Sequence, residues 1–146
     1  MPDTVVVEYL YPPKMLEGSW DEKSGNRNVV VHLNGISDGT GETDIIKVYL
    51  SDLKTPSKNV PKRTSVVDIK WRISHMNVLL EWDRAPHAVI ARLNGANGSD
   101  GCFDWSHIGG KLDAGDDDRT GNILLTSSNV VAGDTYDITM TLRLKD

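Results

Sequence analysis

Cysteine and long apolar runs are both scarce in this chain of 146 residues. Cys102 is the single cysteine, and an intramolecular disulfide needs two. A chain of this length buries about 68–70% of its unfolded surface, so it needs no crosslink to be stable. No apolar run approaches the roughly 18 residues of a membrane span, and the start, Met1-Pro2-Asp3-Thr4, lacks the basic and apolar regions of a signal peptide. These absences predict one soluble domain over residues 1–146, made in the cytoplasm.

A basic excess is also missing. The chain has 21 acidic and 16 basic side chains, and its formal net charge is −5. Nucleic-acid binders use Lys and Arg to contact phosphates, and their affinity depends on these contacts. The densest basic stretch here, residues 58–63, is short and contains proline. We therefore expect neither nucleic acid nor a membrane as a partner.

Helical periodicity is almost absent, and alternation of apolar with polar residues replaces it. The clearest case is the C-terminal segment, where every second residue is apolar: Tyr136, Ile138, Met140, Leu142 and Leu144. Such alternation is typical of an antiparallel strand with one buried face. The same pattern predicts eight strands, at residues 5–10, 29–33, 44–50, 67–73, 76–82, 87–93, 122–126 and 136–144.

Eight short strands with compact turns predict a two-sheet antiparallel sandwich. A jelly roll uses eight strands and is the favoured architecture. An immunoglobulin-like sandwich is the alternative, although the chain lacks its Cys and Trp spacing. Ser74-His75 is short enough for a tight hairpin, and Asp83-Arg84-Ala85-Pro86 predicts a second turn. Only residues 51–54 are expected to form a helical turn.

Two stretches are too long to be simple turns. Residues 11–27 follow the first strand, so segment 1–27 is expected to be an extended N-terminal part of the domain, and residues 94–121 form the second stretch. Loops of this length in a compact domain are often functional. Both contain aromatic residues, which dominate binding hot spots. Four of them are the candidate partner contacts: Tyr11, Trp20, Phe103 and Trp105. The alternative for Trp20 and Trp105 is that each pins its loop onto the sandwich. Trp71 and Trp82 lie on apolar strand faces and are expected in the core.

No residue constellation predicts catalysis, a metal or a cofactor. Cys102 and His107 lack the third group and the local signature that accompany a nucleophile and its base. No Gly-x-Ser-x-Gly motif is present, and no two histidines have the helical spacing of a zinc site. Calcium remains open for the acidic loops, which carry Asn94, Asn97, Asp100, Asp113 and the run 116–118, although their order does not match an EF-hand.

Several segments resemble small proteins encoded in the structural modules of tailed bacteriophages, over about residues 29–144. They are Ser37-Asp38-Gly39-Thr40-Gly41-Glu42-Thr43-Asp44, Leu80-Glu81-Trp82-Asp83, Ile108-Gly109-Gly110, Gly121-Asn122-Ile123-Leu124-Leu125-Thr126 and Ala132-Gly133-Asp134-Thr135-Tyr136. The resemblance implies a capsid decoration (cement) protein of the virion surface. Such proteins bind the major capsid protein on the outer shell, commonly as trimers, and stabilise it. A tail or fibre component and a carbohydrate-binding module are the alternatives.

Overall fold

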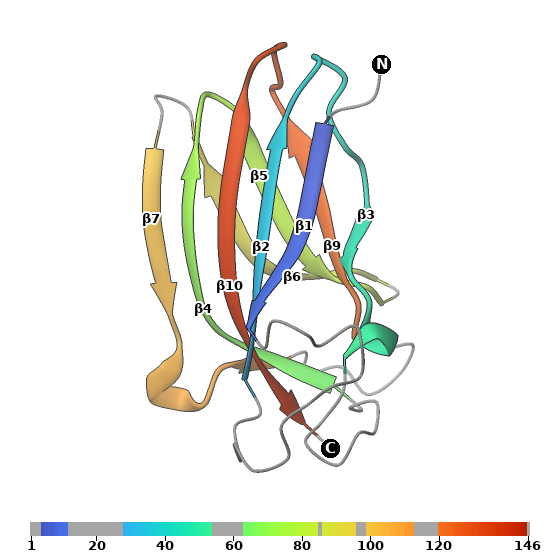
Figure 1. Ribbon diagram of the computed structural model, residues 1–146, viewed down its shortest axis with the longest axis vertical. Coiled ribbons are helices and arrows are strands. Elements are labelled where there is room, and N and C mark those ends of the chain that lie inside the picture. Colours follow the sequence, from blue (N-terminus) through green and yellow to red (C-terminus); the bar gives the residue numbers. More distant parts are fainter. Residues whose placement is uncertain are drawn as a thin grey trace.

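The computed structural model describes residues 4–11, 28–53, 63–84, 86–95, 99–112 and 120–145. Within these ranges the chain forms ten strands, two short 3-10 helices and no α-helix (Figure 1). The strands are β1 (Thr4–Tyr11), β2 (Asn28–Ile36), β3 (Ile45–Val48), β4 (Arg63–Ile73), β5 (Asn77–Trp82), β6 (Ala88–Asn94), β7 (Ser99–Asp104), β8 (Lys111–Leu112), β9 (Ile123–Ser128) and β10 (Thr135–Lys145). The 3-10 helices are η3 (Leu50–Asp52) and η4 (Ser106–Ile108).

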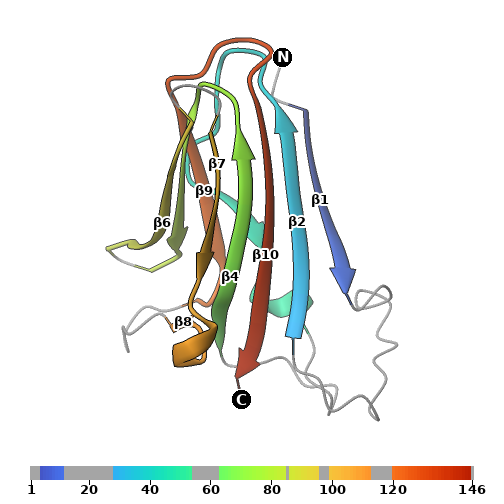
Figure 2. The same ribbon diagram turned by 90° about the vertical axis from the view of Figure 1, so that its left-hand side faces the viewer.

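The strands form two antiparallel sheets that pack face to face (Figure 2). The larger sheet has the order β1-β2-β10-β4-β7, and β8 pairs with β4 beyond the end of β7. The smaller sheet has the order β3-β9-β5-β6. The two-sheet, all-β sandwich expected from the sequence is therefore confirmed.

Eight of the strands follow the order of a jelly roll. The pairs β2–β10 and β4–β7 lie in the larger sheet, and the pairs β3–β9 and β5–β6 lie in the smaller sheet. A long antiparallel hairpin whose successive strand pairs roll alternately into two sheets produces this order. The immunoglobulin-like alternative is wrong, because that fold orders its strands one-two-five-four in one sheet and three-six-seven in the other. β1 is an addition to the roll and extends the larger sheet at its β2 edge.

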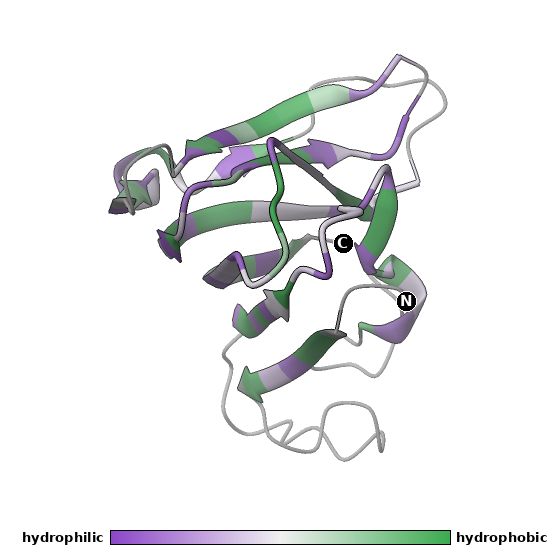
Figure 3. Cartoon of the chain, turned by 90° about the horizontal axis from the view of Figure 1, so that it is seen from above, coloured by the Kyte–Doolittle hydropathy of each residue, from purple (hydrophilic) through white to green (hydrophobic). Residues whose placement is uncertain are grey.

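Hydrophobic and hydrophilic residues form bands along the strands (Figure 3). The alternation buries the apolar side chains between the sheets. In β2, Val29, Val31 and Leu33 are fully buried, whereas the residues between them are partly exposed. All five apolar residues of the predicted C-terminal strand are buried as well. Each such side chain stabilises the fold by about 1.5–3 kcal/mol relative to an exposed one. Trp82 is buried as expected, and Trp71 packs against this core while staying half-exposed.

Segment 94–121 differs from the prediction of a long loop, because it contains β7, η4 and β8. β7 has no apolar alternation, so the sequence did not reveal it. Its place is set instead by a close fit to β4: a side chain at Gly101 would come within 2.7 Å of the Trp71 ring. Eight strands were expected, and the roll does use eight. However, the prediction counted β1 in the roll and omitted β7.

The expected tight hairpin at Ser74-His75 is also wrong. β4 and β5 belong to different sheets, so these residues carry the chain from one layer to the other. The Ser74 amide donates a hydrogen bond to the Thr135 carbonyl, and His75 has a positive φ of 62°. The turn between β5 and β6 does form a hairpin, and η3 matches the expected helical turn. Residues 12–27 lie outside the described residues.

Candidate binding surface

The outer face of the larger sheet carries a row of polar side chains that crosses five strands. Strand register aligns one residue from each strand in this order: Cys102, Lys70, Thr139, His32 and Glu8. These positions alternate with the buried ones, so their side chains point away from the smaller sheet. The centre of this face is therefore hydrophilic and carries charges of both signs.

His32 links three strands of this face. Its Nδ1 lies 2.7 Å from Glu8 Oε1 on β1, and its Nε2 lies 2.7 Å from Asp137 Oδ1 on β10. Both ring nitrogens can donate together only when the imidazole is protonated. The hydrogen bond to Glu8 raises the pKa of His32. Partial burial lowers this pKa, whereas the hydrogen bond to Asp137 and the negative charges of both carboxylates raise it. Protonated His32 thus ties edge strand β1 to the sheet.

We expect the free energy of unfolding to depend on pH through His32. Because its pKa is raised in the folded state, its contribution is complete below the unfolded pKa of about 6.5 and is lost as pH rises through the folded value. Both carboxylates are at least half exposed, so the contribution should stay under about 1 kcal/mol. Urea unfolding of His32→Gln at about pH 6 and about pH 8.5 should show a smaller difference between the two pH values than the parent shows.

His107→Gln is the matched control, because His107 is exposed in η4, which follows β7 at the edge of the sheet far from β1. It should keep the pH dependence of the parent. An unchanged pH dependence in His32→Gln would show that the two hydrogen bonds contribute nothing to stability.

A shallow hollow of about 540 Å³ includes part of this row and lies over β7, β4 and β10. Its polar lining residues are Lys70, Arg72, Asp100, Cys102, Asp137 and Thr139. Arg72 and Asp100 approach each other at 3.9 Å and are both mostly exposed. Since the hollow is open and mixed in charge, it resembles a polar contact surface more than an enclosed ligand pocket.

Apolar side chains are exposed at the β1 edge of the same face. Val6 is 45% exposed and Ile36 is 54% exposed, and register places both on the outer side of the sheet. Leu10, at a bulge near the end of β1, is 50% exposed. Tyr9 points the other way and packs against the core, where burial raises its pKa to about 12 with a further contribution from the Asp52 charge. β1 is thus anchored from inside while it presents apolar surface outside.

β1 is also an edge strand, because within the described ranges it pairs only with β2. Natural sheets protect their edges with short strands, charges or bulges. β7 carries Asp100 and Asp104, β3 has only four residues and an irregular register, and β6 exposes Arg92 beside a bulge. β1 spans eight residues, and its single bulge lies near its C-terminal end. Glu8 is its one charged residue, and Val6 and Leu10 stay exposed on either side of it.

The four aromatic residues expected to contact a partner are distributed unevenly. Phe103 and Trp105 stack with ring centroids 5.4 Å apart, and Lys111 Nζ lies 5.3 Å from the Trp105 ring. Both rings are half-buried and pack against the core. Tyr11 ends β1, but its side chain is outside the described set, as is the whole of Trp20. Of the four, only Phe103 and Trp105 have described side chains, and these two are in contact.

The candidate catalytic pair and some of the candidate calcium ligands lie within the described residues. Cys102 is exposed on β7 and His107 is exposed in η4, and no hydrogen bond or ion pair joins them in the described part of the chain. Of the possible calcium ligands, Asn97, Asp113 and the run 116–118 lie outside the described residues. One group that sequence spacing did not reveal could hold a metal ion: Asp44, Glu81 and His87.

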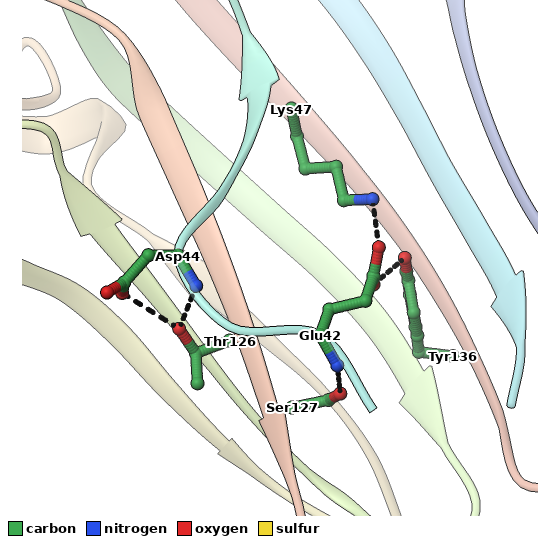
Figure 4. Close-up of polar contacts among 6 residues, drawn as sticks. All are labelled: Glu42, Asp44, Lys47, Thr126, Ser127 and Tyr136. Atoms are coloured by element: carbon green, nitrogen blue, oxygen red, sulfur yellow. Dashed lines mark hydrogen bonds and ion pairs between the residues drawn. The ribbon is translucent and has the colours of Figure 1, made fainter. Parts of the chain in front are cut away.

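The connection from β2 to β3 is held by polar contacts, of which those of Glu42 are part-buried and those of Asp44 exposed (Figure 4). Glu42 accepts a hydrogen bond from Tyr136 Oη at 2.8 Å and forms an ion pair with Lys47. The Glu42 amide donates to Ser127 Oγ, and the Asp44 amide donates to Thr126 Oγ1 at 2.9 Å. Glu42 therefore points into the sandwich, whereas Asp44 lies over β9 on the outer side.

No helix in the described part of the chain is both long and apolar enough to cross a bilayer. No protein-family model, curated protein or solved structure matches the chain. Function is therefore inferred from the residues themselves.

Proposed function

We propose that this chain is a structural virion protein of a tailed bacteriophage that decorates the capsid. It binds the major capsid protein on the outer shell and stabilises the assembled lattice. The sequence segments that resemble proteins of phage structural modules support this class. The observation that carries the contact mechanism is the exposed apolar edge formed by β1 and the end of β2, with Val6, Leu10 and Ile36.

An exposed apolar edge strand is costly for an isolated protein, because it leaves both side chains and backbone groups available for unwanted pairing. A partner that covers this edge satisfies the free backbone groups and buries the apolar side chains, since a new strand can pair with β1 while apolar side chains pack beside it. The polar row ends on β1 at Glu8, which lies between Val6 and Leu10, so apolar and polar side chains meet at this edge. Protein interfaces combine apolar and polar contacts in this way.

Binding to the intact shell would stabilise it by mass action. A ligand that prefers the assembled lattice shifts the disruption equilibrium in proportion to its differential affinity. We propose a homotrimer on the shell, because trimers are common in the resembling proteins and an unprotected edge strand can be buried between copies. Sedimentation of the pure protein and of protein released from shells would test this, and a monomer in both would contradict it.

The decisive experiment mixes the purified protein with capsids of the same phage that lack it. We expect saturable occupancy of the shell and a higher temperature of DNA release. A double variant, Val6→Lys with Ile36→Lys, should bind at least tenfold more weakly, because it places two charges in the contact and each costs free energy when buried. Both positions are exposed, so the variant should fold with little change in stability.

Ile108→Lys is the matched control, since Ile108 is 63% exposed in η4, on the β7 side of the sandwich away from β1 (Figure 1). It should bind shells like the parent. Bare shells with the parent protein, together with binding to tail fibres or host polysaccharide, would replace the decoration role with a receptor-binding one. Binding that the β1-edge variant leaves intact would move the contact to another surface.

A further inference from the structure

Asp44, Glu81 and His87 come together at one end of the smaller sheet from three different segments. Asp44 immediately precedes β3, Glu81 lies near the end of β5, and His87 immediately precedes β6. One carboxylate oxygen from each acidic residue and one ring nitrogen of His87 all lie within 4.8 Å of one another. This cluster lies outside the contact surface proposed above, which belongs to the other sheet.

The distances within the cluster suit coordination better than hydrogen bonding. His87 Nδ1 lies 3.7 Å from Asp44 Oδ1 and 3.6 Å from Glu81 Oε1. A hydrogen bond from a ring nitrogen to a carboxylate is about 2.7–2.9 Å long. Two ligands that each lie about 2.1 Å from one ion are about 3.4 Å apart at the tetrahedral angle. The observed separations leave the space that an ion would occupy.

His32 provides an internal comparison. It also lies between two carboxylates, yet both of its distances are 2.7 Å, the length of charged hydrogen bonds. An imidazole and two carboxylates thus lie at hydrogen-bond distance on the larger sheet, whereas in the cluster the same three groups lie farther apart.

Glu81 supplies the second observation. Its side chain is only 13% exposed, and within the described part of the chain its carboxylate makes no hydrogen bond and has His87 as its one ion-pair neighbour. A largely buried carboxylate costs several kcal/mol unless it is paired or coordinates a cation. His87 at 3.6 Å compensates Glu81 only from beyond hydrogen-bond distance, and a cation between the three side chains would compensate it directly.

Asp44 is oriented by its neighbour on β9. Thr126 Oγ1 accepts a hydrogen bond from the Asp44 amide at 2.9 Å and donates one to Asp44 Oδ1 at 3.2 Å (Figure 4). Partners of this kind hold a liganding carboxylate in place and tune its affinity for a metal. The cluster therefore has three potential ligands and one supporting residue.

We propose that Asp44, Glu81 and His87 bind one divalent transition-metal ion of the Zn²⁺ class. An imidazole nitrogen with two carboxylate oxygens suits such an ion, whereas Ca²⁺ prefers six to eight oxygens and Mg²⁺ an octahedron of oxygens. Three protein ligands leave a fourth position for water or for a group from outside the chain. The bound ion fastens the β2–β3 connection to the β5–β6 turn across β9.

The test uses the full chain without an affinity tag, freed of metal by a chelator. Titration calorimetry should show one Zn²⁺ bound per chain. Zn²⁺ at about 100 times its Kd should raise the Tm by about 5–10 °C. Mg²⁺ and Ca²⁺ at the same concentration should leave the Tm unchanged.

His87→Ala and Glu81→Gln should each weaken Zn²⁺ binding by at least tenfold and remove most of the Tm shift. His75→Ala is the matched control, because His75 Nδ1 lies 3.9 Å from a single carboxylate, that of Asp134, and offers no third ligand. It should bind Zn²⁺ like the parent. The proposal fails if the parent binds no Zn²⁺ at micromolar concentration, if His87→Ala and Glu81→Gln bind as well as the parent, or if His75→Ala loses binding equally. None of these outcomes bears on capsid binding.

Discussion

Replacing Lys47 with methionine should destabilise the folded protein by about 3–5 kcal/mol. The Lys47 side chain is 4% exposed and its partner Glu42 is 9% exposed. Methionine fills most of the same volume but removes the positive charge, so Glu42 would stay buried with only the Tyr136 hydroxyl to compensate it. Urea or thermal unfolding measures the loss directly. It is a large share of the roughly 5–15 kcal/mol that holds a typical domain together.

The double variant Lys47→Met with Glu42→Gln separates the buried charge from the packing. It leaves no uncompensated ion, so its loss should be clearly smaller than the sum of the two single losses. Tyr136→Phe removes one hydrogen bond from the same carboxylate and should cost about 1.5–3 kcal/mol. A loss below about 1 kcal/mol for Lys47→Met would show that water reaches Glu42 and that the pair behaves as a surface ion pair.

Truncation of Trp82 to alanine should cost about 3–5 kcal/mol, because the side chain is 2% exposed and its loss leaves a large cavity between the sheets. Trp82→Phe should cost much less than its lost volume suggests. The Trp82 Nε1 atom is buried without a hydrogen-bond partner among the described residues. Phenylalanine removes this unsatisfied donor, whose burial itself costs about 1–3 kcal/mol.

Chemical unfolding of both Trp82 variants beside the parent would check the expectation. A loss for Trp82→Phe as large as that for Trp82→Ala would contradict it and would indicate that the indole nitrogen has a partner. Trp71 is a useful comparison, because its buried Nε1 also lacks a partner in the part of the chain that the structure describes and its ring lies over Gly101 at the β4–β7 contact.

The strands of the core could be read from the sequence because each carries its own signal. Alternation in β10 and β2 reports which face is buried, and this depends only on neighbouring residues. β7 has no such signal, since it lies at an edge and is fitted to β4 by Gly101. The sequence likewise does not state which strands share a sheet. The turn at Ser74-His75 is as short as a hairpin, yet it joins two layers.

The polar clusters could not be predicted, because their members are brought together only by the complete fold. Tyr136 and Glu42 are 94 residues apart and meet through the pairing of β10 beside β2. Asp44 and His87 likewise come from separate strand connections, with no spacing that marks a metal site. The two histidines that lie between two carboxylates, His32 and His87, looked like ordinary strand residues in the sequence.

The order of the strands has a consequence for biosynthesis. β10 lies between β2 and β4, and β9 lies between β3 and β5, so the two strands that leave the ribosome last occupy interior positions in both sheets. Until they emerge, a nascent chain can form only separate pairs, namely β1–β2, the β5–β6 hairpin and β4 with β7 and β8. Such long-range pairing is slow and exposes unpaired strands to chaperones and to aggregation. A premature stop before residue 122 should therefore give insoluble protein, with no partly folded domain to recover.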